Sequence, residues 1–266
     1  MAILKNYNGE VLTFPTHTHK NTDTIGMVSD TANGMMAASD KKELEEYYMA
    51  AIEYGLYLKR IMYLSKDAKT IKLIDGKTFN KALKSVGPNA TAITFTKTAI
   101  PSAKLTSATL ISNENTPSRV YMYLDNTIIY ISPEKENDII SASDICMGMF
   151  SGLTKITSIN LANFDGSKII TASNMFAGDS ALTSISGLEN LDMDLLSDTT
   201  NMFNGCTNLS ATMSISNPSI KLYSGMFTNC STGSGAKFTI RYTDAGTKAL
   251  AINLISTKSA SSKVSI

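Results

Sequence analysis

The second half of the chain repeats one pattern of apolar residues. A Met-Phe dipeptide recurs at intervals of 26, 27 and 24 residues, at Met149-Phe150, Met175-Phe176, Met202-Phe203 and Met226-Phe227. Apolar residues follow in matching register, at Ile156, Ile159 and Leu161 in the first copy and at Leu182 and Ile185 in the second. A unit of this length, with one short strand, buries its apolar face only by stacking on its neighbours. The period therefore predicts a solenoid whose core contains the Met and Phe side chains.

A different apolar period marks residues 40–69. Asp40, with Glu43 three residues later, has the form of a helix N-cap. Apolar residues then advance alternately by three and four positions, at Leu44, Tyr47, Ala51, Tyr54, Leu58 and Ile61. This spacing is that of a coiled-coil seam, but a helix packed on its own domain explains a seam this short equally well. The sequence thus predicts a long helix and leaves its partner open.

Between this helix and the repeats the pattern is that of β-strands. Val120–Leu124 and Thr127–Ile131 flank Asp125-Asn126, which predicts a hairpin because Asx residues tolerate the positive φ of a tight turn. Further expected elements are a strand over 92–96, a short helix over 78–86, a strand near 238–242 and a helix near 244–255.

These patterns divide the chain into five parts and predict an α+β fold rich in β-strands. The parts are a polar, Thr-rich N-terminal arm (1–39), the long helix (40–69), a β-rich lead-in that caps the repeats (70–144), the repeats (145–230) and a C-terminal cap (231–266). We expect a C-terminal cap because the last repeat would otherwise expose its stacking face.

Composition and charge exclude several classes of function. The 24 basic and 23 acidic side chains give a net charge of +1, so no overall field attracts nucleic acid or an acidic membrane. The sequence has no long apolar run and its start lacks the features of a secretory signal, so we expect folding in a cytoplasm without membrane insertion. Three cysteines are too few for a disulfide framework, and we interpret Cys206 and Cys230 as packed apolar side chains.

The amino-acid sequence of the repeats resembles that of a known family. Asn201–Leu209 and Ile159–Asp165 resemble the BspA-like leucine-rich repeats of bacterial surface proteins, and with its lead-in the resemblance covers residues 78–240. It implies a leucine-rich-repeat solenoid that is lined by β-strands and used for adhesion. The register departs from the family's pattern after Met202, in the third copy, where Met213 and Ile215 replace the expected ladder.

The N-terminal sequence resembles that of a second family. His17-Thr18-His19, followed by Met36–Leu44, is similar to a segment of phage tail fibres and receptor-binding proteins. The resemblance implies a homotrimer in which the helix over 40–69 forms a trimeric coiled coil and the arm over 1–39 attaches to other tail or baseplate proteins. Such proteins leave the host cytoplasm by lysis, which would explain a surface-binding protein that has no secretory signal.

The candidate metal site consists of His17 and His19, the two histidines of the chain. One residue separates them in a segment expected to be extended, so both rings point to one side. Two imidazoles make a weak site, and in a monomer they would bind nothing. The resemblance to trimeric fibres implies six imidazole nitrogens around one iron-like transition-metal ion with octahedral geometry per trimer.

No arrangement of residues points to catalysis or to another cofactor. Both histidines belong to the arm, so a Ser/His/Asp or Cys/His arrangement would need the repeats to fold back on it. Asp192 with Asp194 or Glu189 could supply the carboxylate pair of a glycoside hydrolase. We interpret them as solvated loop charges, because they lie in an irregular stretch between repeats. The sequence therefore predicts a protein that is not an enzyme.

The expected receptor-binding residues alternate with the apolar ladder of the repeats. They are Lys155, Thr157, Ser158, Asn160, Thr183, Ser184 and Ser186, mostly small polar residues that suit hydrogen bonding to a glycan or a protein loop. We expect a phage tail-fibre or tail-tip protein, located in the virion, that recognises a bacterial surface glycan or protein. The alternative is a BspA-like adhesin at the bacterial surface, and a further alternative is a depolymerase of surface polysaccharide.

Overall fold

The structure is a computed structural model that describes residues 68–112, 118–188, 191, 194–216 and 218–266. The predicted arm over 1–39, its metal site at His17 and His19, and the predicted long helix up to residue 67 lie outside these residues. Ala68 and Lys69, the last residues of that predicted helix, are not helical. Among the helices that the structure describes, none is long and apolar enough to cross a membrane.

The helix α2 (Gly76–Val86) begins where an aspartate caps it. The Asp75 side chain accepts a hydrogen bond from the backbone N–H of Thr78 (3.1 Å), a group that would otherwise lack a partner. Phe79 on the first turn is fully buried, and its ring contacts the ring of Phe150 edge-on with 5.8 Å between centroids. The sequence predicts this helix from Thr78 onward, and the prediction is confirmed with a start two residues earlier.

The largest sheet combines antiparallel and parallel strands in the order β3-β4-β5-β2-β7-β9. Its strands are β2 (Ala92–Phe95), β3 (Thr109–Leu110), β4 (Val120–Asp125), β5 (Ile128–Pro133), β7 (Ser158–Asn160) and β9 (Ser184–Ser186). β4 and β5 pair antiparallel and form the predicted hairpin. Its turn residues are Asn126, with a φ of 53°, and Thr127, so the turn lies one position later than predicted.

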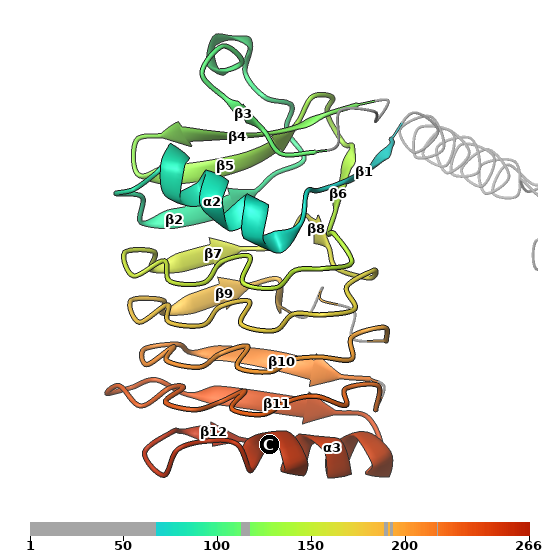
Figure 1. Cartoon of the computed structure of the whole chain (residues 1–266), viewed down its shortest axis with the longest axis vertical. Coiled ribbons are helices and arrows are strands. Elements are labelled where there is room, and N and C mark those ends of the chain that lie inside the picture. Colours follow the sequence, from blue (N-terminus) through green and yellow to red (C-terminus); the bar gives the residue numbers. More distant parts are fainter. Residues whose placement is uncertain (1–67, 113–117, 189–190, 192–193, 217) are drawn as a thin grey trace, which may run out of the picture. The chain divides into compact units, whose positions relative to one another are not determined.

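Two sheets of three parallel strands contain the other described strands. One holds β1 (Thr70–Lys72), β6 (Ile139–Ser141) and β8 (Phe164–Asp165), and the other holds β10 (Ala211–Ile215), β11 (Phe238–Tyr242) and β12 (Val264–Ser265). In Figure 1, β7, β9, β10, β11 and β12 lie one below another, and α3 (Ala245–Ile255) lies at the C-terminal end. The strand predicted near 238–242 and the helix predicted near 244–255 are confirmed.

The Met-Phe dipeptides form the centre of the core. Consecutive rings stack, with centroid distances of 5.2 Å for Phe150–Phe176, 5.4 Å for Phe176–Phe203 and 5.7 Å for Phe203–Phe227. The Met and Phe side chains of all four dipeptides are 1% exposed or less. The backbone joins the same turns, because the N–H of each of the first three Phe residues donates to the carbonyl of the next Met at 2.8 to 3.0 Å. The prediction that these pairs pack in the core is confirmed.

Each Met-Phe turn contains two residues in the left-handed region of backbone conformation. The residue before the Met is Gly148, Asn174, Asn201 or Gly225, and the third residue after the Met is Gly152, Gly178, Gly205 or Asn229, with φ between 55° and 81°. Glycine and asparagine adopt this conformation at the lowest cost. At Gly225 there is a second requirement, because an added Cβ would overlap the Oδ1 of Asn201. The pattern Gly/Asn-Met-Phe-x-Gly/Asn is therefore the local cause of these turns.

The predicted fold class is wrong. A leucine-rich-repeat solenoid would present one ladder of equivalent strands, and a trimeric coiled coil needs a long helix. The described strands instead divide among three sheets, one of them mixed, and both α-helices of the described residues have eleven residues. Strand length is the reason: β7 and β9 have three residues each, and β9 meets the next turn through an isolated bridge between Ser184 and Ser210.

Candidate recognition surface

Four neighbouring strands of the largest sheet each place one outward residue in a row. These residues, which we call the strand row, are Tyr130 on β5, Thr94 on β2, Asn160 on β7 and Ser186 on β9. Thr94 pairs with both Tyr130 and Asn160, and Asn160 pairs with Ser186. The residues that precede them, Ile129, Ile93, Ile159 and Ile185, are buried, so alternation along the strands turns the row away from the core. Neighbouring strands lie about 4.8 Å apart, so the row is about 14 Å long.

The strand row offers hydrogen-bonding groups without charge. It contains three hydroxyls and one amide. The Asn160 Oδ1 accepts a hydrogen bond from the Ala162 N–H (2.9 Å), while its Nδ2 group donates to no partner within the described residues. The ring of Tyr130 lies nearly parallel to that of Tyr123, with 5.5 Å between centroids, which holds the ring in place. Uncharged donors and acceptors beside a fixed aromatic ring suit an uncharged polar ligand.

The structure places four of the seven predicted receptor-binding residues on this sheet. Asn160 and Ser186 belong to the strand row. Ser158 and Ser184 pair with each other two residues earlier on the same two strands and point to the same side. Ser158 and Asn160 are half-buried, and Ser184 and Ser186 are exposed.

The other three predicted residues are engaged in hydrogen bonds within the fold. The hydroxyl of Thr157 donates to the carbonyl oxygen of Thr91 (3.0 Å), and the hydroxyl of Thr183 donates to the carbonyl oxygen of Thr157 (2.8 Å). Lys155 lies in a turn before β7, and its Nζ donates to the carbonyl oxygen of Pro88 (3.3 Å). These three side chains tie successive segments together, and their role in receptor binding stays a prediction.

Sequence analysis missed Thr94 and Tyr130, although it predicted both of their strands. Alternation along a strand indicates which residues point outward, but it does not give the register between strands that are far apart in the chain. That register follows from nonlocal pairing, because each strand aligns its buried isoleucine with the isoleucine of its neighbour.

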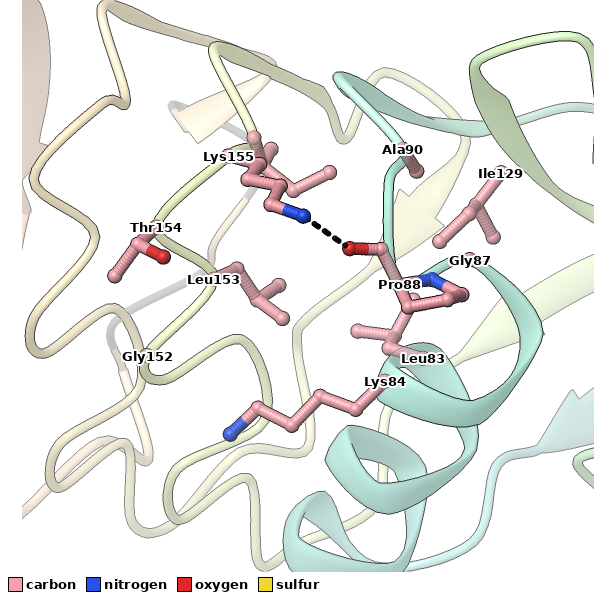
Figure 2. A pocket seen from close by; sticks show the side chains of 11 residues that line it. Leu83, Lys84, Gly87, Pro88, Ala90, Ile129, Gly152, Leu153, Thr154 and Lys155 are labelled. Atoms are coloured by element: carbon pink, nitrogen blue, oxygen red, sulfur yellow. Dashed lines mark hydrogen bonds between the residues drawn. The ribbon is translucent and has the colours of Figure 1, made fainter.

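A pocket of about 240 Å³ lies between α2 and the first Met-Phe turn (Figure 2). Its lining combines buried apolar side chains with exposed or half-buried residues that include two lysines. The buried residues are Leu83, Ala90, Ile129, Leu153 and Ile156, and the others are Lys84, Gly87, Pro88, Gly152, Thr154 and Lys155. Sequence analysis did not identify this pocket, because only the fold brings residues 83–90 beside residues 152–156.

Asp179 is a fully buried carboxyl in the second Met-Phe turn. Its Oδ1 accepts a hydrogen bond from the Leu153 N–H of the preceding turn (2.7 Å), and its Oδ2 has no partner among the described residues. Burial raises the pKa of Asp179 to about 8, although the Leu153 hydrogen bond and the charge of Lys84 oppose the shift. The carboxyl is therefore mostly protonated at neutral pH. It occupies the repeat position of Cys206 and Cys230, a signal that the sequence contained and that we did not use.

The remaining candidates for chemistry are the cysteines and the carboxylate pair. All three cysteines are buried and free, which confirms the interpretation of Cys206 and Cys230 as packed side chains. Burial raises the pKa of the Cys146 and Cys230 thiols to about 12, and that of Cys206 well above its usual value. Of the three carboxylates considered, the structure describes Asp194, which is exposed and accepts a hydrogen bond from Ser216 (3.3 Å). Within the described ranges, no group of three or more His, Cys, Asp or Glu could hold a metal ion.

A comparison with protein families gives a match over the repeats. Residues 144–238 match the profile of a family described as "Mycoplasma protein of unknown function, DUF285". The matched segment contains all four Met-Phe dipeptides and ends at the first residue of β11. Neither the curated proteins nor the solved structures gave a significant match. The family match supports a BspA-like repeat protein over residues 144–238, and it does not reach the segment that resembles phage tail fibres.

Proposed function

We propose that this chain is a surface-recognition protein of the BspA-like kind, an adhesin at the bacterial surface. The family match over residues 144–238 carries the proposal, because it covers the repeats whose text resembles BspA-like proteins. The strand row provides a surface on which such a protein could bind. In this proposal the chain binds and does not catalyse, and it acts on the cell surface or outside the cell.

The proposed ligand is an uncharged part of a surface glycan or a polar protein loop. The four residues of the strand row carry hydroxyl and amide groups and no charge, so they match hydroxyl groups better than phosphates or carboxylates. Three backbone ladders hold all four strands in register, so the row loses little conformational freedom when a ligand binds. A rigid row of weak donors and acceptors favours a ligand that contacts several of them together.

The test blocks the strand row with bulky side chains. We expect Asn160→Trp and Ser186→Trp each to weaken binding of the full-length protein to cells by about tenfold or more, which corresponds to about 1.4 kcal/mol. The measurement is flow cytometry of labelled protein on a panel of bacterial and animal cells. Ser224→Trp is the matched control, because Ser224 is also an exposed serine but lies outside the strand row. Cell binding that survives both row substitutions would contradict the proposal.

The second candidate function is that of a phage tail-fibre or tail-tip receptor-binding protein in a virion. The observation that favours it is the N-terminal sequence, because His17-Thr18-His19 and Met36–Leu44 resemble a segment of phage tail fibres. This candidate requires a homotrimer, an attachment to other tail or baseplate proteins, and an iron-like metal ion held by the histidines of three chains. Size-exclusion chromatography with light scattering, together with elemental analysis, distinguishes the two candidates. A metal-bound trimer favours the tail fibre, and a metal-free monomer favours the adhesin.

A further inference from the structure

The pocket between α2 and the first Met-Phe turn is a site separate from the strand row. We propose that it binds a small monocarboxylate with an apolar body, such as a saturated acid of about six carbons. In this arrangement the apolar body lies on the buried side chains, and the carboxylate lies between the two lysines.

The volume and the buried lining of the pocket indicate the size and the apolar character of the ligand's body. The volume of about 240 Å³ is below the roughly 300 Å³ at which pockets for drug-sized ligands begin, so the ligand is small. Leu83, Ile129 and Leu153 line the pocket and are at most 9% exposed, so each presents a small apolar surface. A hydrated inorganic anion would leave this surface in contact with water, whereas an alkyl chain would cover it.

The charge at the pocket defines the head group. Lys84 and Lys155 line the pocket, and none of the lining residues is acidic. In Figure 2, Leu153 lies between the two lysine side chains. The charge of Lys84 acts on the carboxyl of Asp179, which burial keeps mostly protonated at neutral pH. The two positive charges therefore remain available to a carboxylate.

Each lysine head group keeps N–H donors for a ligand. The Lys155 Nζ donates to the carbonyl oxygen of Pro88 and to the Oδ1 of Asn89, which leaves one of its three N–H groups. The Lys84 Nζ has no hydrogen-bond or ion-pair partner among the described residues. It lies over Gly152, since a Cβ added there would stand 3.4 Å from it.

The first test compares three ligands of one shape on the full-length protein. Hexanoate, hexanol and hexylammonium each contain six carbons in a straight chain and differ in the charge of the head group. Isothermal titration calorimetry should show saturable binding of hexanoate, with binding of hexanol and hexylammonium at least about tenfold weaker. Equal binding of hexanol would show an apolar crevice without a carboxylate site and would overturn the proposal. Absence of saturable hexanoate binding up to about 10 mM would overturn it as well.

The second test removes the charges and closes the mouth with surface substitutions. Lys84→Met and Lys155→Met should each weaken hexanoate binding about tenfold, while Lys168→Met, a change of an exposed lysine outside the pocket, should leave it unchanged. Thr154→Phe should abolish binding by filling the mouth. Its control is Ser180→Phe, because Ser180 is exposed and stands at the same repeat position in the next turn. Hexanoate binding that all three pocket variants retain would refute the assignment, and thermal melts would verify that each variant is folded.

Discussion

The interior of the Met-Phe turns and the strand row pack against one another's segments but differ in how their residues repeat, and half of the row, Thr94 and Tyr130, comes from the lead-in before the repeats. Inside, Phe recurs at the same position of each turn, with ring centroids 5.2 to 5.7 Å apart. Outside, the residues change from strand to strand, from Tyr130 through Thr94 and Asn160 to Ser186. An interior residue must fit its copies in the two neighbouring turns, whereas an outward residue has no such partner. A residue type that stays the same from turn to turn therefore indicates packing. A residue type that changes from strand to strand indicates a surface that is free to bind a ligand.

The largest expected effect is the loss of an interior ring. Phe203→Ala should lower the free energy of unfolding by about 3 to 5 kcal/mol, because it empties a fully buried aromatic position. Phe203 also contacts Phe176 and Phe227, so neighbouring turns lose a partner too. Chemical denaturation followed by circular dichroism measures the change. A loss below about 1 kcal/mol would mean that the stacked rings contribute little to stability.

The second effect concerns Asp179, which places a carboxyl at the interior position where the next two turns have Cys206 and Cys230. Its pKa of about 8 in the folded chain exceeds the usual value of 3.8, so the unfolded chain loses its proton at lower pH. Between these pH values the unfolded state binds fewer protons than the folded state. The free energy of unfolding therefore falls as pH rises, by up to about 1.4 kcal/mol per pH unit. Asp179→Cys places the residue of the equivalent position, Cys206, in this turn.

The variant should keep up to about 3 kcal/mol that the natural chain loses between pH 5 and pH 7. Urea denaturation of both proteins at pH 5, 6 and 7 provides the measurement. Free energies of unfolding that change with pH in parallel would show that Asp179 is ionised in the folded chain.

The third effect separates backbone conformation from close contact. Gly235→Ala should cost about 1 kcal/mol, because its φ of 78° strains an L-residue while the added Cβ meets open space. Gly225→Ala should cost about 2 to 3 kcal/mol, because the same strain is joined by overlap with Asn201. Thermal denaturation of the two variants measures the difference. Equal losses would mean that the Asn201 side chain moves aside without cost.

The smallest effect on stability is expected on the strand row. Ser186→Ala should change the free energy of unfolding by less than about 0.5 kcal/mol, because the side chain is exposed. The same variant should weaken cell binding if the row is the recognition surface. A large loss of stability at Ser186, measured by the denaturation assay used for Phe203, would remove the contrast between interior and surface.

Local elements were predictable where local chemistry decides them. The hairpin of β4 and β5, the helices α2 and α3 and the buried Met-Phe pairs follow from alternation, capping and period, and the structure confirms them. Asp75 and Asp244 cap the two helices through backbone N–H groups within three residues, so a short stretch of sequence contains the whole interaction.

The predicted single ladder of strands failed because sheet formation is not local. Strands of two or three residues carry too few apolar positions to impose one register along the whole stack, so β1, β6 and β8 pair apart from β7 and β9. The pocket, and the place of Thr94 and Tyr130 in the strand row, were missed for the same reason. Each joins segments about 70 residues apart, such as Lys84 with Lys155 or Thr94 with Asn160.

The sequence by itself determined that Met-Phe turns recur, that they are buried and that Gly or Asn stands at their left-handed positions. These properties depend on residues within one period, where side-chain size and backbone freedom leave few choices. The tertiary structure decided which outward residues stand side by side, which lysines face one pocket and which carboxyl loses its solvent. Those properties depend on distances between turns, and such distances exist only after the chain has folded.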